Sequence, residues 1–129
     1  MGIARASEDR VSVLVVEDDA RSGRMLAALL REDGFVVEVC PDGPSGFARL
    51  SHDPLPDVLV TDLRMPTVDG VSVARLARRR SASMSIFLTT AFPQLADSLG
   101  PSVEPVLFIK PLDYPELVRS LRIVRDVRA

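Results

Sequence analysis

The sequence is short of the residues that build disulfide frameworks and large aromatic cores. Its 129 residues include no tryptophan, one cysteine, one histidine and 5% aromatic residues. A single cysteine excludes an internal disulfide and fits a reducing compartment, so we expect a cytoplasmic protein. His52 has no metal-ligating neighbours in the sequence and is given no functional role. The core must therefore consist mostly of leucine, valine, isoleucine and alanine, in a chain whose length suits one domain.

Long hydrophobic runs and an excess of one charge are also missing. No apolar run approaches the roughly 20 residues that span a bilayer, and no secretory signal is visible, so we expect no membrane partner. The formal net charge is −2, which gives no general attraction to nucleic acid. The arginines from Arg75 to Arg80 have no aromatic residues among them and are interpreted as a solvated helix end. We therefore expect no nucleic-acid partner for this domain.

Short apolar runs alternate with amphipathic stretches, a pattern typical of βαβ units around a parallel sheet. Residues 1–9 are polar and unpatterned, so we interpret them as a disordered or vector-derived start and residues 10–129 as one domain. Pro93, Pro101 and Pro105 leave room for only a short fourth helix. The expected strands are Val11–Val16, Phe35–Val39, Asp57–Thr61, Ser85–Thr90 and Val106–Ile109. The expected helices run from about Arg21 to Asp33, to near Leu50, from Asp69-Gly70 through Arg80, and from Asp113 to about Arg125.

Several predicted helix ends carry capping residues. Asp19 and Asp113 stand where an N-cap is expected, and Glu116 is placed to complete a capping box with Asp113. Gly34 follows the first helix, as a C-cap glycine does. These residues support the predicted boundaries independently of the hydrophobic pattern.

Polar side chains follow four of the predicted strands at the point where each strand ends. Glu17 and Asp18 follow the first strand, Asp62 follows the third, Thr90 closes the fourth and Lys110 follows the fifth. Ligands of open parallel sheets bind outside the carboxyl ends of the strands. Three carboxylates, a hydroxyl and an ammonium group at one edge suit a divalent cation beside a phosphoryl group.

Four stretches of the chain carry a resemblance to a known family: VLVVEDDAR, PDVLVTDLRMPTVDG, IFLTTAF and LFIKPLD. In this order and at these separations they resemble the receiver domain of bacterial two-component response regulators, from Val11 to about Val127. The resemblance implies an α/β, flavodoxin-like, doubly wound (βα)5 three-layer sandwich. The parallel sheet would have the strand order 2-1-3-4-5, and the fourth helix would be shortened here.

The resemblance also implies a role for each residue at the strand ends. Asp62 would accept a phosphoryl group from a histidine kinase or a histidine phosphotransfer protein, and Lys110 would pair with a phosphoryl oxygen. Mg²⁺ would be bound by Asp18, by Asp62, by Glu17 through water and by the backbone carbonyl of Arg64. In this reading the chain catalyses its own phosphorylation and dephosphorylation and turns over no independent substrate.

The expected hydroxyl donor is Thr90, which occupies the family's threonine position. Thr89 is the weaker candidate, because strand alternation turns it away from the side of Thr90. Phe92 stands at the expected mouth of the site, where a bulky ring would exclude water and slow dephosphorylation. The resemblance further implies a cis peptide between Lys110 and Pro111.

One departure from the family falls in the fifth strand. Receivers usually carry tyrosine or phenylalanine three residues before the lysine, and here that position is Leu107. Phe108 lies one residue on, so it should face the opposite side and belong to the core. The face of the fourth helix, fifth strand and last helix is the expected site of a homodimer or a downstream partner. Since that face is altered, an alternative is an adaptor whose binding does not depend on phosphorylation.

Two other protein classes share the expected fold, and the residues disfavour both. A flavin carrier would need a phosphate-binding loop rich in serine, threonine and glycine after the first strand. Glu17, Asp18 and Asp19 would repel a phosphate there. A haloacid-dehalogenase-type phosphatase would need a second aspartate two residues after its nucleophile, where Arg64 stands.

Overall fold

The structure, a computed structural model, describes residues 10–65 and 68–128, with side chains as far as Val124. The predicted start at residues 1–9 lies outside this range, so its nature stays a prediction. Strands and helices alternate along the chain, as the hydrophobic pattern predicted. The strands are β1 (Ser12–Val16), β2 (Val36–Cys40), β3 (Val58–Asp62), β4 (Ser85–Thr90) and β5 (Val106–Ile109). The helices are α2 (Ala20–Glu32), α3 (Gly43–Leu50), α4 (Gly70–Arg80), the 3₁₀ segment η1 (Pro93–Leu99) and α5 (Tyr114–Arg128).

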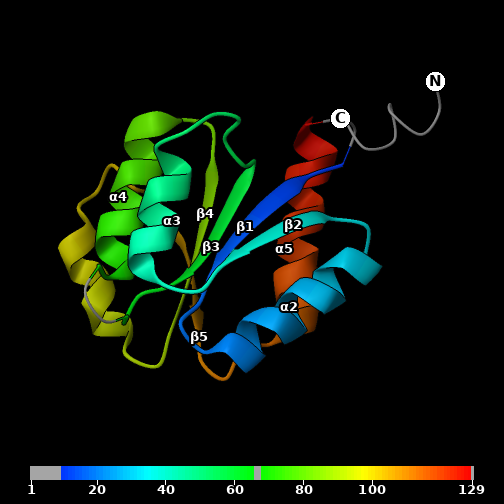
Figure 1. The fold of residues 1–129 in the computed structure, drawn as a ribbon, viewed down its shortest axis with the longest axis horizontal. Coiled ribbons are helices and arrows are strands. Elements are labelled where there is room, and N and C mark those ends of the chain that lie inside the picture. The colour runs from blue at the N-terminus through cyan, green and yellow to red at the C-terminus, as the bar shows by residue number, and fades with distance from the viewer. Residues whose placement is uncertain (1–9, 66–67, 129) are drawn as a thin grey trace.

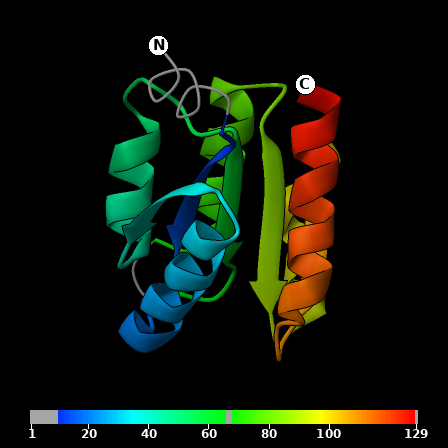
Figure 2. The same ribbon diagram turned by 90° about the vertical axis from the view of Figure 1, so that its right-hand side faces the viewer.

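The five strands form one parallel sheet in the order β2-β1-β3-β4-β5. Helices α3 and α4 cover one face of this sheet, and α2 and α5 cover the other (Figure 1). The strand arrows point the same way, so their carboxyl ends meet at one edge (Figure 2). The predicted flavodoxin-like fold and strand order are confirmed; β1, β2 and β3 each begin one residue later than predicted.

Strand alternation divides the core into two apolar clusters, one under each helix layer. Leu14, Leu59 and Leu88 pack toward α3 and α4. Their neighbours Val15 and Val60 point to the opposite face and pack toward α2 and α5. Because β1 and β3 lie in the middle of the sheet, they are covered on both faces and read as continuous apolar runs.

The predicted N-caps are present. The Asp19 carboxylate accepts a hydrogen bond from the Ser22 N–H at 3.1 Å, and the Asp113 carboxylate accepts one from the Glu116 N–H at 3.1 Å. The returning bond of a capping box, from the Asp113 N–H to the Glu116 carboxylate, is not found in the described part of the chain. Glu116 is exposed, so its carboxylate stays hydrated instead. Gly34 has a φ of +97°, the left-handed conformation expected after the helix.

The fourth helix is reduced to η1, a 3₁₀ segment that begins at Pro93 and ends before Gly100. This confirms the predicted shortening. Pro93 fixes the first turn, and Pro101 follows directly after Gly100, so the chain cannot continue as a regular helix. A short segment covers less of the sheet than a full helix would, which leaves the β5 edge more open.

Arginines of α4 hold this short segment through its backbone. The Arg75 guanidinium donates to the carbonyl of Leu99 at 3.2 Å and also to that of Ser98. Arg78 Nε donates to the carbonyl of Val103 at 2.9 Å. Arg75 is exposed, as expected for a solvated helix end, but the carbonyl contacts of the two side chains were not predicted. The Leu99 and Val103 carbonyls lie 24 and 25 residues after Arg75 and Arg78 along the chain, so local composition gave no sign of these contacts.

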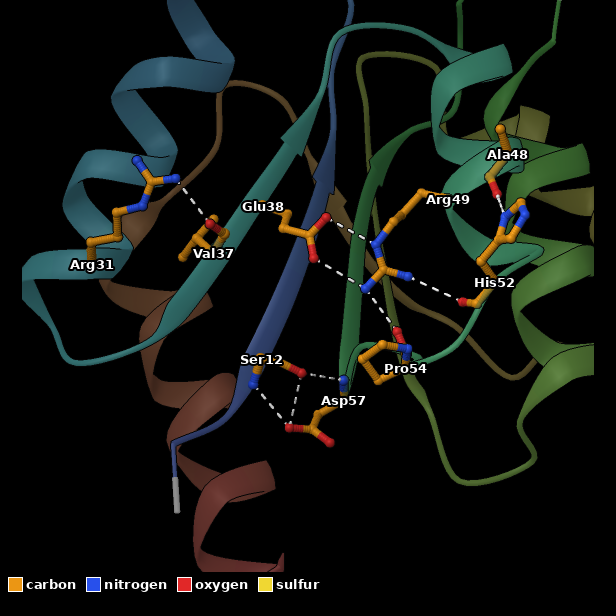
Figure 3. Close-up of polar contacts among 9 residues, drawn as sticks. All are labelled: Ser12, Arg31, Val37, Glu38, Ala48, Arg49, His52, Pro54 and Asp57. Atoms are coloured by element: carbon orange, nitrogen blue, oxygen red, sulfur yellow. Dashed lines mark hydrogen bonds and ion pairs between the residues drawn. The ribbon is translucent and has the colours of Figure 1, made fainter. Parts of the chain in front are cut away.

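A second polar network lies away from the carboxyl ends of the strands (Figure 3). The Ser12 N–H donates to the Asp57 carboxylate at 2.9 Å, and the Asp57 N–H donates to the Ser12 hydroxyl at 3.0 Å. Arg49 of α3 binds Glu38 of β2 through two parallel hydrogen bonds of 2.9 and 3.0 Å. These contacts fix the starts of β1 and β3 and tie the outer strand β2 to α3.

Candidate functional site

The carboxyl ends of β1 and β3 bring three acidic side chains together. Glu17 and Asp18 follow directly after Val16, the last residue of β1, and Asp62 is the last residue of β3. Carboxylate oxygens of these three residues lie within 4.8 Å of one another. Asp62 is 7% exposed, whereas Asp18 is exposed and Glu17 lies between. The neighbouring strands β1 and β3 therefore build the acidic cluster that their sequences predicted.

Lys110 places its ammonium group against this cluster. Its Nζ lies 2.7 Å from Asp62 Oδ2 and 3.7 Å from Glu17 Oε1. Burial acts to lower the pKa of Lys110, but the hydrogen bond to Asp62 and the charges of Asp62 and Glu17 outweigh it, so the pKa is raised. Lys110 is therefore cationic at neutral pH. The Lys110–Pro111 peptide is cis, as the resemblance implied.

The pKa of the Glu17 carboxyl is raised above its ordinary value. Burial raises the pKa of its carboxyl, and the nearby Asp62 charge adds to the increase. The Asp19 N–H, which donates to Glu17 Oε2 at 3.1 Å, and the Lys110 ammonium both oppose it. One lysine thus faces three acidic groups, which favours a further cation at this place. Hard carboxylate oxygens are the donors that Mg²⁺ prefers, so the residues present fit this ion.

Backbone and loop groups complete the surroundings of Asp62. The Arg64 N–H donates to Asp62 Oδ1 at 3.1 Å, so both carboxylate oxygens are engaged, one by Arg64 and one by Lys110. The Arg64 guanidinium lies over the ring of Phe92, 4.9 Å from its centroid. Phe92 is exposed, and the pair lines a hollow separate from the cavity that Asp62 lines.

A close approach of the backbone fixes the loop behind Asp62. A Cβ added to Gly70 would lie 2.1 Å from the Asp62 carbonyl oxygen and 2.6 Å from the Leu63 Cα. Only glycine fits there, because the neighbouring atoms belong to the backbone. The start of α4 is thereby pressed against the end of β3, which positions the Asp62 carboxylate.

The two threonines at the end of β4 have different surroundings. The Thr90 hydroxyl accepts a hydrogen bond from the Phe92 N–H at 2.9 Å. Thr89 pairs with Asp62 in the β3–β4 register, and paired residues of parallel strands face the same side. The alternation of Thr89 and Thr90 was predicted correctly. The register between β3 and β4 could not be predicted from the sequence, so the face that Thr89 shares with Asp62 was not foreseen.

A cavity of about 250 Å³ opens beside the cluster. Its polar lining includes Glu17, Asp62, Thr89 and Lys110, the residues that surround the acidic group on this side. The rest of the lining is largely apolar and comes from β1, β3, α2 and the turn after β5: Val15, Val16, Leu26, Val60, Pro111 and Leu112. The site is therefore a small polar opening with an apolar floor, as small-ligand sites commonly are.

The fifth strand has its aromatic residue on the inner side. Phe108 is 6% exposed and meets Phe87 edge-on, with ring centroids 5.7 Å apart and an interplanar angle of 63°. Leu107 is 36% exposed. The prediction that Phe108 belongs to the core is confirmed. No ring is available at Leu107 to turn between the surface and the site.

The structure thus brings together a buried parallel sheet, a carboxylate cluster where β1 and β3 end, and a lysine paired with one of these carboxylates, all in one α/β domain. The chain matches the response regulator receiver domain family over residues 13–122. It belongs to this family, which serves two-component systems. Receiver domains bind Mg²⁺ at an acidic cluster and interact with histidine kinases or phosphotransfer proteins. Glu17, Asp18 and Asp62 form such a cluster here.

Relatives of known sequence support the assignment. The sensory transduction protein RegX3 of Mycolicibacterium smegmatis is 32% identical over 114 residues, which cover 88% of this chain and 50% of RegX3. The response regulator receiver protein CpdR of Brucella abortus is 33% identical over 112 residues, which cover 84% of this chain and 92% of CpdR. The chain thus spans about half the length of several relatives such as RegX3 and nearly all of CpdR.

Solved structures support the fold. A receiver domain of a Francisella response regulator superposes with a TM-score of 0.81 at 22% identity and covers 93% of this chain and 100% of its own. A response regulator receiver protein from Sinorhizobium medicae also gives a TM-score of 0.81, at 25% identity over 93% of this chain and 98% of its own. Within the described residues, no helix has the length and apolarity needed to cross a membrane.

Proposed function

We propose that this chain accepts a phosphoryl group on Asp62 in a Mg²⁺-dependent reaction and changes its interactions as a result. The observation that carries the proposal is the setting of the Asp62 carboxylate. It is buried, bonded to the Lys110 ammonium at 2.7 Å and the Arg64 N–H at 3.1 Å, and grouped with Glu17 and Asp18. A carboxylate so positioned is suited to act as a nucleophile toward phosphorus.

The proposed transfer forms an acyl phosphate. An Asp62 carboxylate oxygen bonds to the phosphorus while the P–N bond of a phosphohistidine breaks, and its electron pair stays on the imidazole nitrogen. Lys110 stabilises the charge on the phosphoryl oxygens from the side on which it already meets Asp62. Thr90 is proposed as a hydroxyl donor to the phosphoryl group. Its oxygen accepts from the Phe92 N–H, which leaves its own proton to donate.

The metal in this proposal is held by the acidic cluster. Asp18 and Asp62 would be direct ligands, Glu17 would act through water, and the backbone carbonyl of Arg64 would supply a further oxygen. Bound Mg²⁺ neutralises negative charge on the phosphoryl group. The crowding of Glu17, Asp18 and Asp62 within 4.8 Å supports this assignment, because the three carboxylates repel one another without a cation.

The proposed phosphodonor is a histidine kinase or a histidine phosphotransfer protein in the cytoplasm. The domain is proposed to span residues 10–129, within which the family match covers 13–122. The proposed output surface is the face of η1, β5 and α5, where a homodimer or a downstream protein would bind. Exposed Val106, Leu107 and Ile109 on β5 support this choice, since apolar surface favours protein contacts.

The intact mass tests the proposed phosphorylation directly. The protein is incubated with acetyl phosphate and Mg²⁺, and a gain of one phosphoryl mass is expected for the wild type. Asp62→Asn should fold normally and gain no label, and omission of Mg²⁺ should slow labelling strongly. Full labelling of Asp62→Asn, or label mapped to another residue, would overturn the proposal.

A second candidate is an adaptor whose binding does not depend on phosphorylation. The observation that favours it is β5, where Leu107 replaces the family's aromatic residue and Phe108 is packed on Phe87. NMR spectra with and without Mg²⁺ and beryllofluoride, a phosphoryl mimic, separate the two candidates. A signalling receiver should show changes in η1 and β5, whereas the adaptor should show changes only beside Asp62. A turn of Phe108 toward Thr90 would contradict its assignment to the core.

A further inference from the structure

Thr89 brings a second hydroxyl to the side of the site that Lys110 occupies. In the β3–β4 ladder it stands directly opposite Asp62, and the Leu63 N–H donates to its carbonyl at 3.1 Å, which fixes this register. Asp62, Thr89 and Lys110 all line the cavity beside the cluster. The three side chains therefore meet at one opening, although they come from three different strand ends.

The Thr89 hydroxyl has no hydrogen-bond partner in the described part of the chain. Thr89 is 6% exposed, and no fully enclosed polar side-chain atom lacks a partner in that same part. Its hydroxyl therefore reaches the open space of the cavity. The Thr90 hydroxyl, by contrast, is engaged by the Phe92 N–H at 2.9 Å. The Thr90 oxygen is thus held in place by a bond that it accepts, with its own proton still available, whereas the Thr89 hydroxyl takes part in no bond among the described residues.

The cavity that Thr89 lines is largely apolar, so a Thr89 hydroxyl without a hydrogen bond is unfavourable there. Val15, Val60 and Leu112 line the same cavity, so valine would suit the position on packing grounds alone. A hydroxyl placed among apolar groups costs free energy unless it forms a hydrogen bond. The group that would supply this partner is a phosphoryl group on Asp62, whose oxygens extend from the carboxylate into the opening.

We propose that the Thr89 hydroxyl donates a hydrogen bond to a phosphoryl oxygen on Asp62, on the cavity side beside Lys110. Thr89 is then a phosphoryl-binding residue in addition to Thr90. It takes no part in bond making: the Asp62 O–P bond forms and the donor's bond to phosphorus breaks, while the Thr89 proton stays on its oxygen. This inference rests on the proposed phosphorylation of Asp62.

The test compares two substitutions that differ by one hydroxyl. Thr89→Val keeps the shape and removes the donor, and Thr89→Ser keeps the donor. The rate of labelling by acetyl phosphate in Mg²⁺ and the affinity for beryllofluoride are measured for each. Thr89→Val should lose about tenfold in both, as expected for a hydrogen bond to a charged group, and Thr89→Ser should remain close to the wild type. The melting temperature of Thr89→Val should not fall, since the Thr89 hydroxyl has no hydrogen-bond partner to lose among the described residues.

Controls separate this inference from the proposed function. Thr90→Val is the matched variant at the neighbouring threonine, and Thr89→Ala is a second hydroxyl-free variant should valine disturb the fold. If Thr89→Val and Thr89→Ala label and bind beryllofluoride as well as the wild type does, the inference is overturned while phosphorylation of Asp62 stands. If the wild type itself takes no label at Asp62, the proposed function fails and the inference fails with it.

Discussion

The centre of the sheet and its β5 edge are built in different ways. All five residues of β3 are buried, whereas only one of the four residues of β5 is. The centre carries the acidic cluster and is packed on both faces, so its geometry is fixed by many contacts. The edge depends on Phe108 and on hydrogen bonds from α4 to backbone carbonyls near η1. The chemistry is therefore placed on the rigid part of the molecule and the exposed apolar surface on the part with fewer constraints.

The strongest test of the centre is Gly70→Ala. The added methyl would overlap the Asp62 carbonyl oxygen and the Leu63 Cα, and neither can move without shifting β3. We expect the free energy of unfolding to fall by about 3 kcal/mol, as for a severe overpacking change. Urea denaturation measures it. Gly34→Ala is the control, because space is open around Gly34 and only its φ of +97° opposes alanine, for a loss of about 1 kcal/mol. Equal losses would contradict the tight fit at Gly70.

At the edge, Phe108→Ala should be the damaging change and Leu107→Ala the mild one. Phe108 is buried against Phe87, so its removal leaves a cavity that costs about 3 kcal/mol or more. Leu107 is partly exposed, so we expect a loss below about 1 kcal/mol. Thermal unfolding of the two variants side by side checks the contrast. A larger loss for Leu107→Ala would show that the edge is anchored from its outer face.

Mg²⁺ should stabilise the centre by mass action. At 100 times its dissociation constant, a ligand that binds only the folded state adds about 2.7 kcal/mol. Asp18→Ala should remove the rise in melting temperature on Mg²⁺ addition, and Glu17→Ala should only reduce it. Asp97→Ala, which removes an exposed carboxylate from η1, is the control and should keep the full shift. A full shift in Asp18→Ala would place the metal elsewhere.

Phe92→Ala tests whether the Phe92 ring slows hydrolysis of a phosphoryl group on Asp62. The ring lies under the Arg64 guanidinium at 4.9 Å and is expected to limit access of water to a phosphorylated Asp62. Removing it should speed dephosphorylation by about tenfold, which corresponds to roughly 1.4 kcal/mol in the barrier. Decay of the phosphoprotein is followed after acetyl phosphate is removed, with Phe92→Tyr as the ring-retaining control. Identical decay in all three proteins would rule out a guarding role.

Tyr114→Phe should have the smallest effect on stability. It removes one hydrogen bond between the start of α5 and the residue that follows α2. The Tyr114 hydroxyl donates to Asp33 Oδ2 at 2.6 Å. Burial and this bond raise the pKa of Tyr114, so it remains a protonated donor at neutral pH. Its loss should cost about 1 kcal/mol of unfolding free energy, with labelling of Asp62 unchanged. Chemical denaturation and the intact mass together check this, and a loss of labelling would link the α2–α5 contact to the site.

The sequence predicted the centre better than the edge, for physical reasons. Glu17, Asp18 and Asp62 end apolar runs, and parallel strands must bring such ends together, so their meeting follows from local pattern and topology. The register between β3 and β4 depends on packing across the sheet, so the shared face of Asp62 and Thr89 was hidden. The contacts of Arg75 were hidden as well, because its partners are backbone atoms that every residue carries.

The backbone bonds from Arg75 and Arg78 also bear on how this domain can diverge. They bind carbonyl oxygens in and just after η1, so much of the attachment of η1 does not depend on which side chains η1 carries. Exposed positions of η1 can therefore be exchanged with little loss of the segment's place in the fold. A surface that keeps its position while its chemistry drifts is a suitable region in which related proteins can acquire different binding preferences, leaving the acidic cluster untouched.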